Sequence, residues 1–182
     1  IKFLKKRLEK ITYETKSHFD RLNTLTMMMA DALNLSQKER DELKLLCEFH
    51  DIGKIGVAKD ILQKEGKLNE EEWESIKRHS EIGYYIVKEI NKVSSIDELI
   101  LIHHERWDGK GYPWVLKDEE IPLVARIFAL ADAYDSMVND RPFKNRMTKQ
   151  AALNEIKEQS GLQFDPKLTE LFINLMDGEQ IV

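Results

Sequence analysis

The chain has 182 residues, and its 28 Lys and Arg residues against 33 Asp and Glu residues leave a formal net charge of −5. This acidic balance excludes a broadly basic coat for polymeric nucleic acid but leaves room for a local anion site. Hydrophobic residues make up 42% of the chain and charged residues 34%, which favours a globular domain over disorder. With one cysteine and no apolar run near the roughly 18 residues of a membrane span, we expect no membrane insertion and a reducing, cytoplasmic setting.

The amino-terminal segment has a helical period. Apolar side chains recur every three or four residues from Leu4 to Met29, and basic residues interleave with them over residues 1–11. Because residues 1–11 lack the apolar core of a signal peptide, we interpret them as the end of a helix leading from an upstream regulatory domain. As a helix, they could transmit a signal from that domain or form a homodimer contact.

The remaining elements are also predicted to be helices. Ser36 and Glu39 form a capping-box pattern before the second helix, which we expect to end at Gly53. The later patterns are a helix capped by Asn69, a helical run from Ile82 to Ile90, a helix from Asp97 to Ile102, a polar loop from Arg106 to Glu120, a long helix beginning near Pro122, and helices at about 148–159 and 166–176. No alternating run predicts a strand, so we expect a single all-α domain, residues 1–182, forming one bundle of about seven to eight helices.

Polar residues interrupt the apolar stripes of these helices. Glu14 and His18 continue the first stripe four residues apart, and His50, followed directly by Asp51, continues the second. All five histidines of the chain occupy such positions: His18, His50, His79, His103 and His104. Burying groups of this kind is costly unless they are paired or bound to metal.

A lone inward histidine is usually a satisfied core residue, but five of five favour a shared metal site in the core of the bundle. Asp132 and Asp135, three residues apart on an inward-packing helix, could contribute carboxylates. Nitrogen and carboxylate ligands without a thiolate suit Mn, Fe, Zn or Ni. The potential ligands exceed one coordination sphere, which indicates two or more ions.

Several sequence motifs occur together along the chain. His50-Asp51 is followed by Gly-Lys-Ile-Gly, and HHERWDGKGYP stands at 103–113. The segments IPLVARIFALADAYDSMVNDRP at 121–142 and FDP at 164–166 follow them. The first of these motifs resembles the HD signature and the second resembles the GYP motif. In this order, the motifs resemble the HD-GYP family of HD-domain metal-dependent phosphohydrolases over most of the chain.

This resemblance implies a bacterial cytoplasmic phosphodiesterase that hydrolyses cyclic di-GMP to linear pGpG and/or GMP, through attack of a metal-activated hydroxide on phosphorus. It implies two or three divalent transition-metal ions, with Fe or Mn favoured over Zn or Ni. The positions that match the family's metal ligands are Glu14, His18, His50, Asp51, His79, His103, His104 and Asp132. Asp51 matches the bridging carboxylate, and Glu14 matches a ligand of members with a third ion. Lys54, Tyr112, Arg141 and Lys144 match positions that contact substrate.

Simpler interpretations remain for the substrate-contacting residues. Lys54 could only neutralise a helix carboxyl terminus, and Tyr112 could only serve a turn. Arg141 and Lys144 lie in a polar loop where solvated charges are usual, so their role rests on the resemblance. Asp135 is a weaker candidate, for orienting a ligand histidine.

The loop after the GYP motif departs from the family. The family usually has glycines at the positions of Val115 and Asp118. If those glycines adopt positive φ, we expect these replacements to change the path of the loop. Two alternative functions therefore stay open: a related HD phosphohydrolase for another cyclic dinucleotide or nucleotide, and a non-catalytic cyclic di-GMP sensor or docking module.

Overall fold

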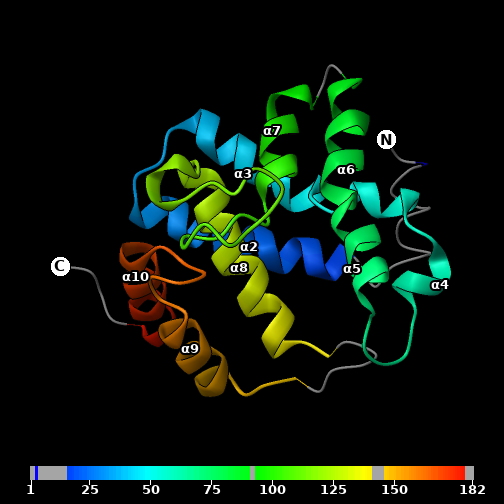
Figure 1. The fold of residues 1–182 in the computed structure, drawn as a ribbon. Helices are drawn as coiled ribbons and strands as arrows, with labels where there is room; N and C mark the ends of the chain where they lie inside the picture. Colours follow the sequence, from blue (N-terminus) through cyan, green and yellow to red (C-terminus); the bar gives the residue numbers. More distant parts are fainter. Residues whose placement is uncertain (1–2, 4–15, 91–92, 141–145, 179–182) are drawn as a thin grey trace.

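The computed structural model describes residues 3, 16–90, 93–140 and 146–178 (Figure 1). Within these residues the structure is helical and contains no strand, only an isolated bridge between Ser160 and Phe164. The α-helices are α2 (Lys16–Ala32), α3 (Gln37–Phe49), α4 (Lys59–Leu62), α5 (Glu70–Lys77), α6 (His79–Lys88), α7 (Asp97–Ile102), α8 (Leu123–Val138), α9 (Lys149–Glu158) and α10 (Pro166–Asp177). Three short 3₁₀ helices lie between them: η1 (Ile52–Gly56), η2 (Ser94–Ile96) and η3 (Asp118–Glu120).

The expected all-α bundle is confirmed. Among the described residues there are nine α-helices, or eight when the single turn α4 is set aside. None of these helices is both long and apolar enough to cross a bilayer. The stripe expected at residues 4–11 lies outside the described residues.

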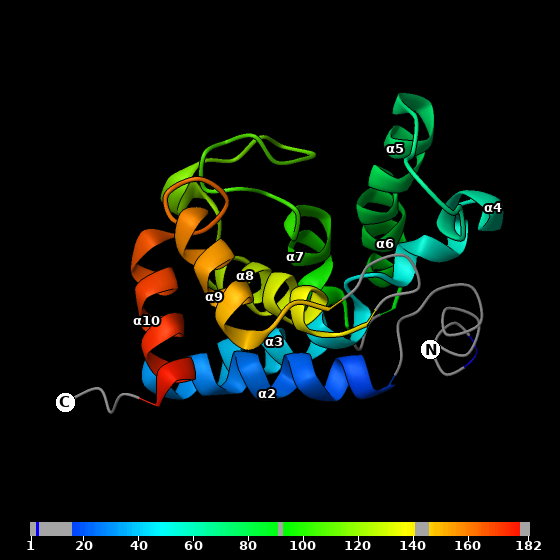
Figure 2. The same cartoon turned by 90° about the horizontal axis from the view of Figure 1, so that it is seen from below.

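Helix α8 forms the centre of the bundle. Its apolar side chains are buried along most of its length, with Ile127, Phe128, Leu130 and Ala131 fully excluded from solvent. Helices α2, α3 and α9 pack against it, and α10 packs on α2, α8 and α9. In Figures 1 and 2, α9 and α10 lie on one side of α8, whereas α4, α5 and α6 lie on the other.

Local sequence signals account for several helix starts. The Ser36 side chain accepts a hydrogen bond from the N–H of Glu39, whose carboxylate accepts from the N–H of Ser36, so the expected capping box is present. Asn69 caps α5 in the same reciprocal way with Glu72. Asp165 caps α10, which begins at Pro166.

The expectation that Gly53 ends the second helix is wrong. Helix α3 ends at Phe49, His50 is its carboxyl-terminal cap, and Gly53 lies inside η1. A Cβ atom on Gly53 would lie 1.9 Å from the carbonyl oxygen of His79 and 2.5 Å from the amide nitrogen of Gly83. Glycine is required here because the backbone of η1 packs directly on the start of α6.

Candidate metal centre

Five separate parts of the fold bring the predicted ligands together. His18 lies in α2, His50 caps α3, and Asp51 follows immediately. His79 is the first residue of α6, His103 caps α7 and His104 follows it, while Asp132 lies in α8. Their donor atoms form two groups, each with all atoms within 4.8 Å of one another: His79, His103 and His104, and His18, His50 and Asp132.

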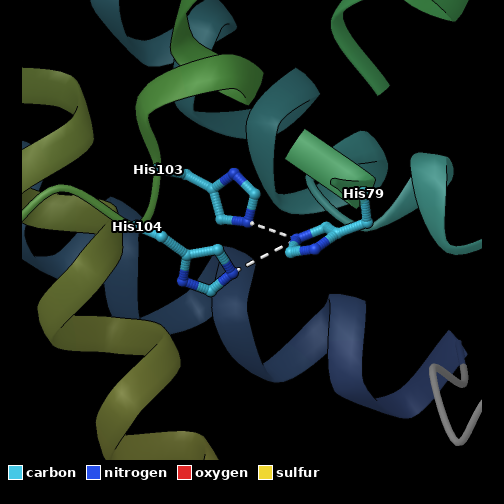
Figure 3. A group of neighbouring side chains, drawn as sticks. All are labelled: His79, His103 and His104. Carbon is cyan, nitrogen blue, oxygen red and sulfur yellow. Dashed lines mark hydrogen bonds between the residues drawn. The ribbon is translucent and has the colours of Figure 1, made fainter. Parts of the chain in front are cut away.

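The first group is a convergence of three imidazole rings (Figure 3). The Nε2 atom of His79 lies 3.3 Å from Nε2 of His103 and 3.2 Å from Nε2 of His104. The Nδ1 atoms of His79 and His103 point the other way, each 2.6 Å from the backbone carbonyl three residues earlier. His79 and His103 are almost completely buried.

The contact between His79 and His103 is chemically informative. A carbonyl oxygen can only accept, so each Nδ1 carries the hydrogen, and each neutral ring presents a lone pair at Nε2. Burial lowers the pKa of both rings, that of His103 strongly, so neither is expected to be an imidazolium near neutral pH. Two lone pairs facing each other at 3.3 Å repel, and a cation between them removes that repulsion.

The second group uses one carboxylate and two rings. The rings of His18 and His50 have centroids 5.7 Å apart, and Nε2 of His18 lies 3.9 Å from a carboxylate oxygen of Asp132. Both histidines are buried, and Asp132 is partly exposed. The set combines two imidazole nitrogen donors with a carboxylate oxygen, which suits a borderline divalent transition metal.

Asp51 lies between the two groups. One carboxylate oxygen is 3.1 Å from Nε2 of His50 and the other is 3.5 Å from Nε2 of His79. The Nζ atom of Lys54 lies 2.6 Å from the oxygen that faces His50. Burial alone would raise the pKa of Asp51, but the neighbouring charges, Lys54 foremost, hold it well below its usual value. Asp51 is therefore an anion that faces both groups at once.

The donor chemistry of the two groups fits divalent ions. All the rings that define the first group are disposed to be neutral donors, since burial also lowers the pKa of His104 to about 3. Two carboxylates accompany the five rings, and no thiolate takes part: the single cysteine, Cys47, is buried, and burial raises its thiol pKa to about 12.

Comparison with known proteins adds the family. A family model described as the HD domain matches residues 2–168. The chain belongs to the HD-domain family. The resemblance seen in the HD and GYP motifs is thereby confirmed.

Three curated relatives of this HD domain are informative. A cyclic di-GMP phosphodiesterase of Thermotoga maritima is 40% identical over 164 residues, which are 89% of this chain and 45% of that protein. The cyclic di-GMP phosphodiesterase response regulator RpfG of Xanthomonas campestris is 38% identical, with 87% of this chain and 43% of that protein covered. The 3'3'-cGAMP-specific phosphodiesterase 2 of Vibrio cholerae is 34% identical, covering 90% and 32%. The chain thus spans less than half the length of each relative.

Solved structures agree on the fold. A crystal structure of a cyclic GMP-AMP-specific phosphodiesterase of V. cholerae aligns with a TM-score of 0.74 and 22% identity over 96% of this chain and 47% of that one. The PgpH HD domain of L. monocytogenes in complex with cyclic-di-AMP aligns with a TM-score of 0.64 and 16% identity, covering 98% of each chain.

The polar loop from Arg106 to Glu120, which contains Gly111-Tyr112-Pro113 and is called the GYP loop below, lies next to the first group. Tyr112 stacks on the ring of His104, with centroids 5.0 Å apart and an interplanar angle of 29°. The Nζ atom of Lys77 lies 5.7 Å from the centroid of the Tyr112 ring. Burial raises the pKa of the Tyr112 hydroxyl, so this group stays protonated at neutral pH.

Glu105, a residue that the sequence interpretation gave no role, anchors the loop. Its buried carboxylate accepts hydrogen bonds from the backbone N–H groups of Trp114, Val115 and Leu116 at 2.7, 3.0 and 3.1 Å. Its position directly after His103-His104 was the only signal in the sequence that could have identified it.

Val115 and Asp118, which stand where the family usually has glycines, adopt the backbone conformation that glycine favours. Val115 has φ of 58° and Asp118 has φ of 52°, both in the left-handed region. Both side chains are therefore accommodated at positive φ, and the expected change in the path of the loop stays a prediction. For a β-branched residue such as Val115 this conformation is strained.

Three of the predicted site residues lie outside the described residues: Glu14, Arg141 and Lys144. The other predicted residues come together around the two histidine groups. Asp135 lies next to them, with a carboxylate oxygen 2.7 Å from Nδ1 of His18.

Proposed function

We propose that the chain is a metal-dependent phosphodiesterase domain that hydrolyses cyclic di-GMP to linear pGpG and/or GMP. The observation that carries this proposal is the position of Asp51 between two groups of histidine and carboxylate donors. The names of the T. maritima and X. campestris relatives support the choice of substrate.

We assign one ion to His79, His103 and His104 and a second to His18, His50 and Asp132, with Asp51 contributing to both. Glu14, four residues before His18, is the candidate ligand for a third ion. Fe or Mn is our first choice of metal, with Zn or Ni also compatible with these ligands. When bound, such ions lower the pKa of a water molecule and oppose the charge of phosphoryl oxygens.

The protein's own side chains have distinct roles in this proposal. The buried Asp51 carboxylate supplies the negative charge that holds two cations close together. Lys54, whose Nζ lies 2.6 Å from that carboxylate, would donate to a substrate phosphate and stabilise the charge that develops there. Tyr112, stacked on His104, would line the nucleotide side of the site. Arg141 and Lys144 would provide further cations for the phosphates.

The same features explain how an acidic chain could bind an anionic substrate. The net charge of −5 is spread over the whole molecule, whereas two divalent ions with Lys54 would make the local field at the site positive. We place the domain in the cytoplasm, downstream of a regulatory domain, with a homodimer through residues 1–11 as an option.

The direct test is hydrolysis. The chain would be loaded with Mn²⁺ or, anaerobically, with Fe²⁺ and incubated with cyclic di-GMP, with products separated by chromatography. We expect pGpG, GMP or both, and no products after removal of metal by a chelator. Metal-loaded protein that yields neither product would refute the proposal.

A second candidate substrate is 3'3'-cGAMP. It is favoured by the name of a V. cholerae relative that is 34% identical over 166 residues. A panel of cyclic di-GMP, 3'3'-cGAMP and cyclic di-AMP at equal concentrations would separate the candidates by kcat/KM. If the chain bound cyclic di-GMP calorimetrically without any turnover, the non-catalytic sensor would replace both.

A further inference from the structure

Asp135 is the second acidic residue of α8 and contacts a ligand histidine from behind. Its carboxylate oxygen Oδ2 lies 2.7 Å from Nδ1 of His18, while Asp132, one helical turn earlier, faces Nε2 of the same ring at 3.9 Å. Asp132 and Asp135 therefore contact opposite nitrogen atoms of one imidazole. Asp135 is only 2% exposed, so its carboxylate needs its own hydrogen-bond donors.

Those donors come from two elements. Arg21, three residues after His18 on α2, donates through Nη2 to Oδ2 of Asp135 at 2.9 Å and through Nε to Oδ1. Asn139, at the end of α8, donates through Nδ2 to Oδ1 at 2.9 Å. Both oxygens are thus held by side chains that can only donate at these atoms, which fixes the orientation of the carboxylate.

We propose that Asp135 is a positioning residue that holds His18 in the Nδ1–H tautomer and thereby presents the Nε2 lone pair to the metal group of His18, His50 and Asp132. An ionised carboxylate can only accept, and its oxygen lies 2.7 Å from Nδ1 of His18, so the ring must carry a hydrogen on that nitrogen. Backbone carbonyls set the same tautomer in His79 and His103. In His18 the tautomer is set by a side chain, that of Asp135, so a mutation can test this role. The inference rests on the metal centre of the proposed function.

A cavity beside the network makes a second kind of test feasible. It has a volume of about 400 Å³ and is lined by Arg21, Asp135 and Asn139 together with the apolar side chains of Leu25 and Val138. A small carboxylate added to the solvent could reach the position of the Asp135 side chain through this space.

The first experiment compares Asp135→Asn with the unmodified chain. The amide has nearly the shape of the carboxylate, but its NH₂ group can donate to Nδ1 and so favours the Nε2–H tautomer, which has no lone pair at Nε2 for the metal. In ¹⁵N NMR spectra of the metal-free chain we expect the wild-type His18 ring to carry its hydrogen on Nδ1 and the variant ring to carry it on Nε2. Zn²⁺ titration should show the affinity of one site reduced by about 10- to 100-fold, with the other unchanged.

Asp165→Asn is the matched control. Asp165 is also a buried aspartate, paired with Arg126 at 2.6 Å, but it caps α10 and contacts none of the histidines. This variant should lose stability and keep both zinc affinities. A wild-type His18 ring with its hydrogen on Nε2 would overturn the proposal, and so would an Asp135→Asn variant that retained either the wild-type tautomer or the wild-type zinc affinities.

The second experiment uses Asp135→Ala with added formate. Formate should restore Zn²⁺ affinity at the weakened site, whereas formamide, which has the same size but also donates, should not. Equal recovery with formamide, or no recovery in the folded variant, would contradict the assignment. None of these measurements involves a cyclic dinucleotide. A chain with the expected tautomer and zinc binding but no hydrolysis would therefore refute only the proposed function.

Discussion

Asp51 and Lys54 are ion-paired at 2.6 Å but differ in what else they touch. The carboxylate of Asp51 also reaches His50 and His79, one from each group of donors, whereas Lys54 is one turn further along η1 and remains partly exposed. In the proposed function, Asp51 is therefore a metal ligand, whereas Lys54 would contact the substrate.

This difference predicts separable defects. Asp51→Ala should abolish turnover and lower the affinity for metal by at least about 100-fold, because it removes a charge shared by both groups. The purified variant should therefore contain little metal. Lys54→Ala should retain the metal and lower kcat roughly 100-fold, because it removes one cation near the substrate phosphate. Metal content by elemental analysis and turnover of cyclic di-GMP would be measured for both, with the exposed Lys59→Ala as control. Equal metal loss in the two variants would refute the division of roles.

At the scale of elements, η1 packs closely on the start of α6 because Gly53 has no side chain. The backbone of Gly53 approaches the carbonyl of His79 so closely that a Cβ atom would lie 1.9 Å from it. Asp51 immediately precedes η1, and His79 begins α6. The fit of the two backbones therefore sets the distance between two of the proposed metal ligands.

Gly53→Ala should separate these elements. We expect the free energy of unfolding to fall by about 1–3 kcal/mol, as in other overpacked positions, and the affinity for metal to fall with it. Gly56→Ala, in the same 3₁₀ helix, is the control: its Cβ would meet the flexible end of the Ile82 side chain at 2.9 Å, so a smaller loss is expected. Urea unfolding and zinc titration would measure both effects, and equal losses in the two variants would contradict the explanation.

The GYP loop contains the opposite case. Val115 has a side chain at a position whose left-handed backbone glycine would adopt with less strain. Val115 is 60% exposed, so its removal forfeits little burial. The left-handed backbone of Val115 destabilises the folded state by roughly 1–2 kcal/mol. Glycine would remove this strain, but its greater freedom in the unfolded chain would lower the stability by about 0.5–1 kcal/mol. Val115→Gly should therefore raise the free energy of unfolding by up to about 1 kcal/mol in urea denaturation. Val115→Ala retains the Cβ and is the control, and a glycine variant no more stable than it would disprove the strain.

For the whole molecule, the buried histidines link stability to pH. The rings of His79, His103 and His104 have pKa values below the ordinary value, chiefly through burial. In the unfolded chain these rings take up protons near pH 6.5, while in the folded chain they stay neutral, so the unfolded state binds more protons and stability falls as the pH falls.

We therefore expect the metal-free protein to lose stability between pH 7 and pH 5, by at most about 1.4 kcal/mol per pH unit for each ring. Saturating Zn²⁺ should raise stability at pH 7, because it binds the folded state. Urea unfolding at pH 7, 6 and 5, with and without zinc, would test both statements. Constant or increasing stability of the metal-free protein toward pH 5 would contradict the first.

Periodicity in the sequence was sufficient for the general plan of the molecule. The three- and four-residue spacing of apolar side chains predicted the helices, and the interruption of those stripes by histidines indicated that the rings face inward. The capping patterns at Ser36 and Asn69 were confirmed because they depend on residues only three apart. The motifs added what spacing cannot supply, namely which of these polar residues act together.

Features that depend on long-range contacts could not be predicted in this way. Arg21 and Asp135 are 114 residues apart, and nothing in the local sequence indicates that they meet. The purpose of Gly53 was misassigned because its neighbour belongs to another helix. The positive φ of Val115 opposes the preference of its own residue type, so a local rule predicts the wrong backbone.

Glu105 links the GYP loop to the first group of histidines. Glu105 directly follows His104, a proposed metal ligand. Its carboxylate accepts hydrogen bonds from three consecutive backbone N–H groups of the GYP loop. Trp114 and its two successors are thus tied by hydrogen bonds to the residue that directly follows His104. Glu105 therefore connects the position of this loop to the position of a proposed metal ligand through two consecutive residues.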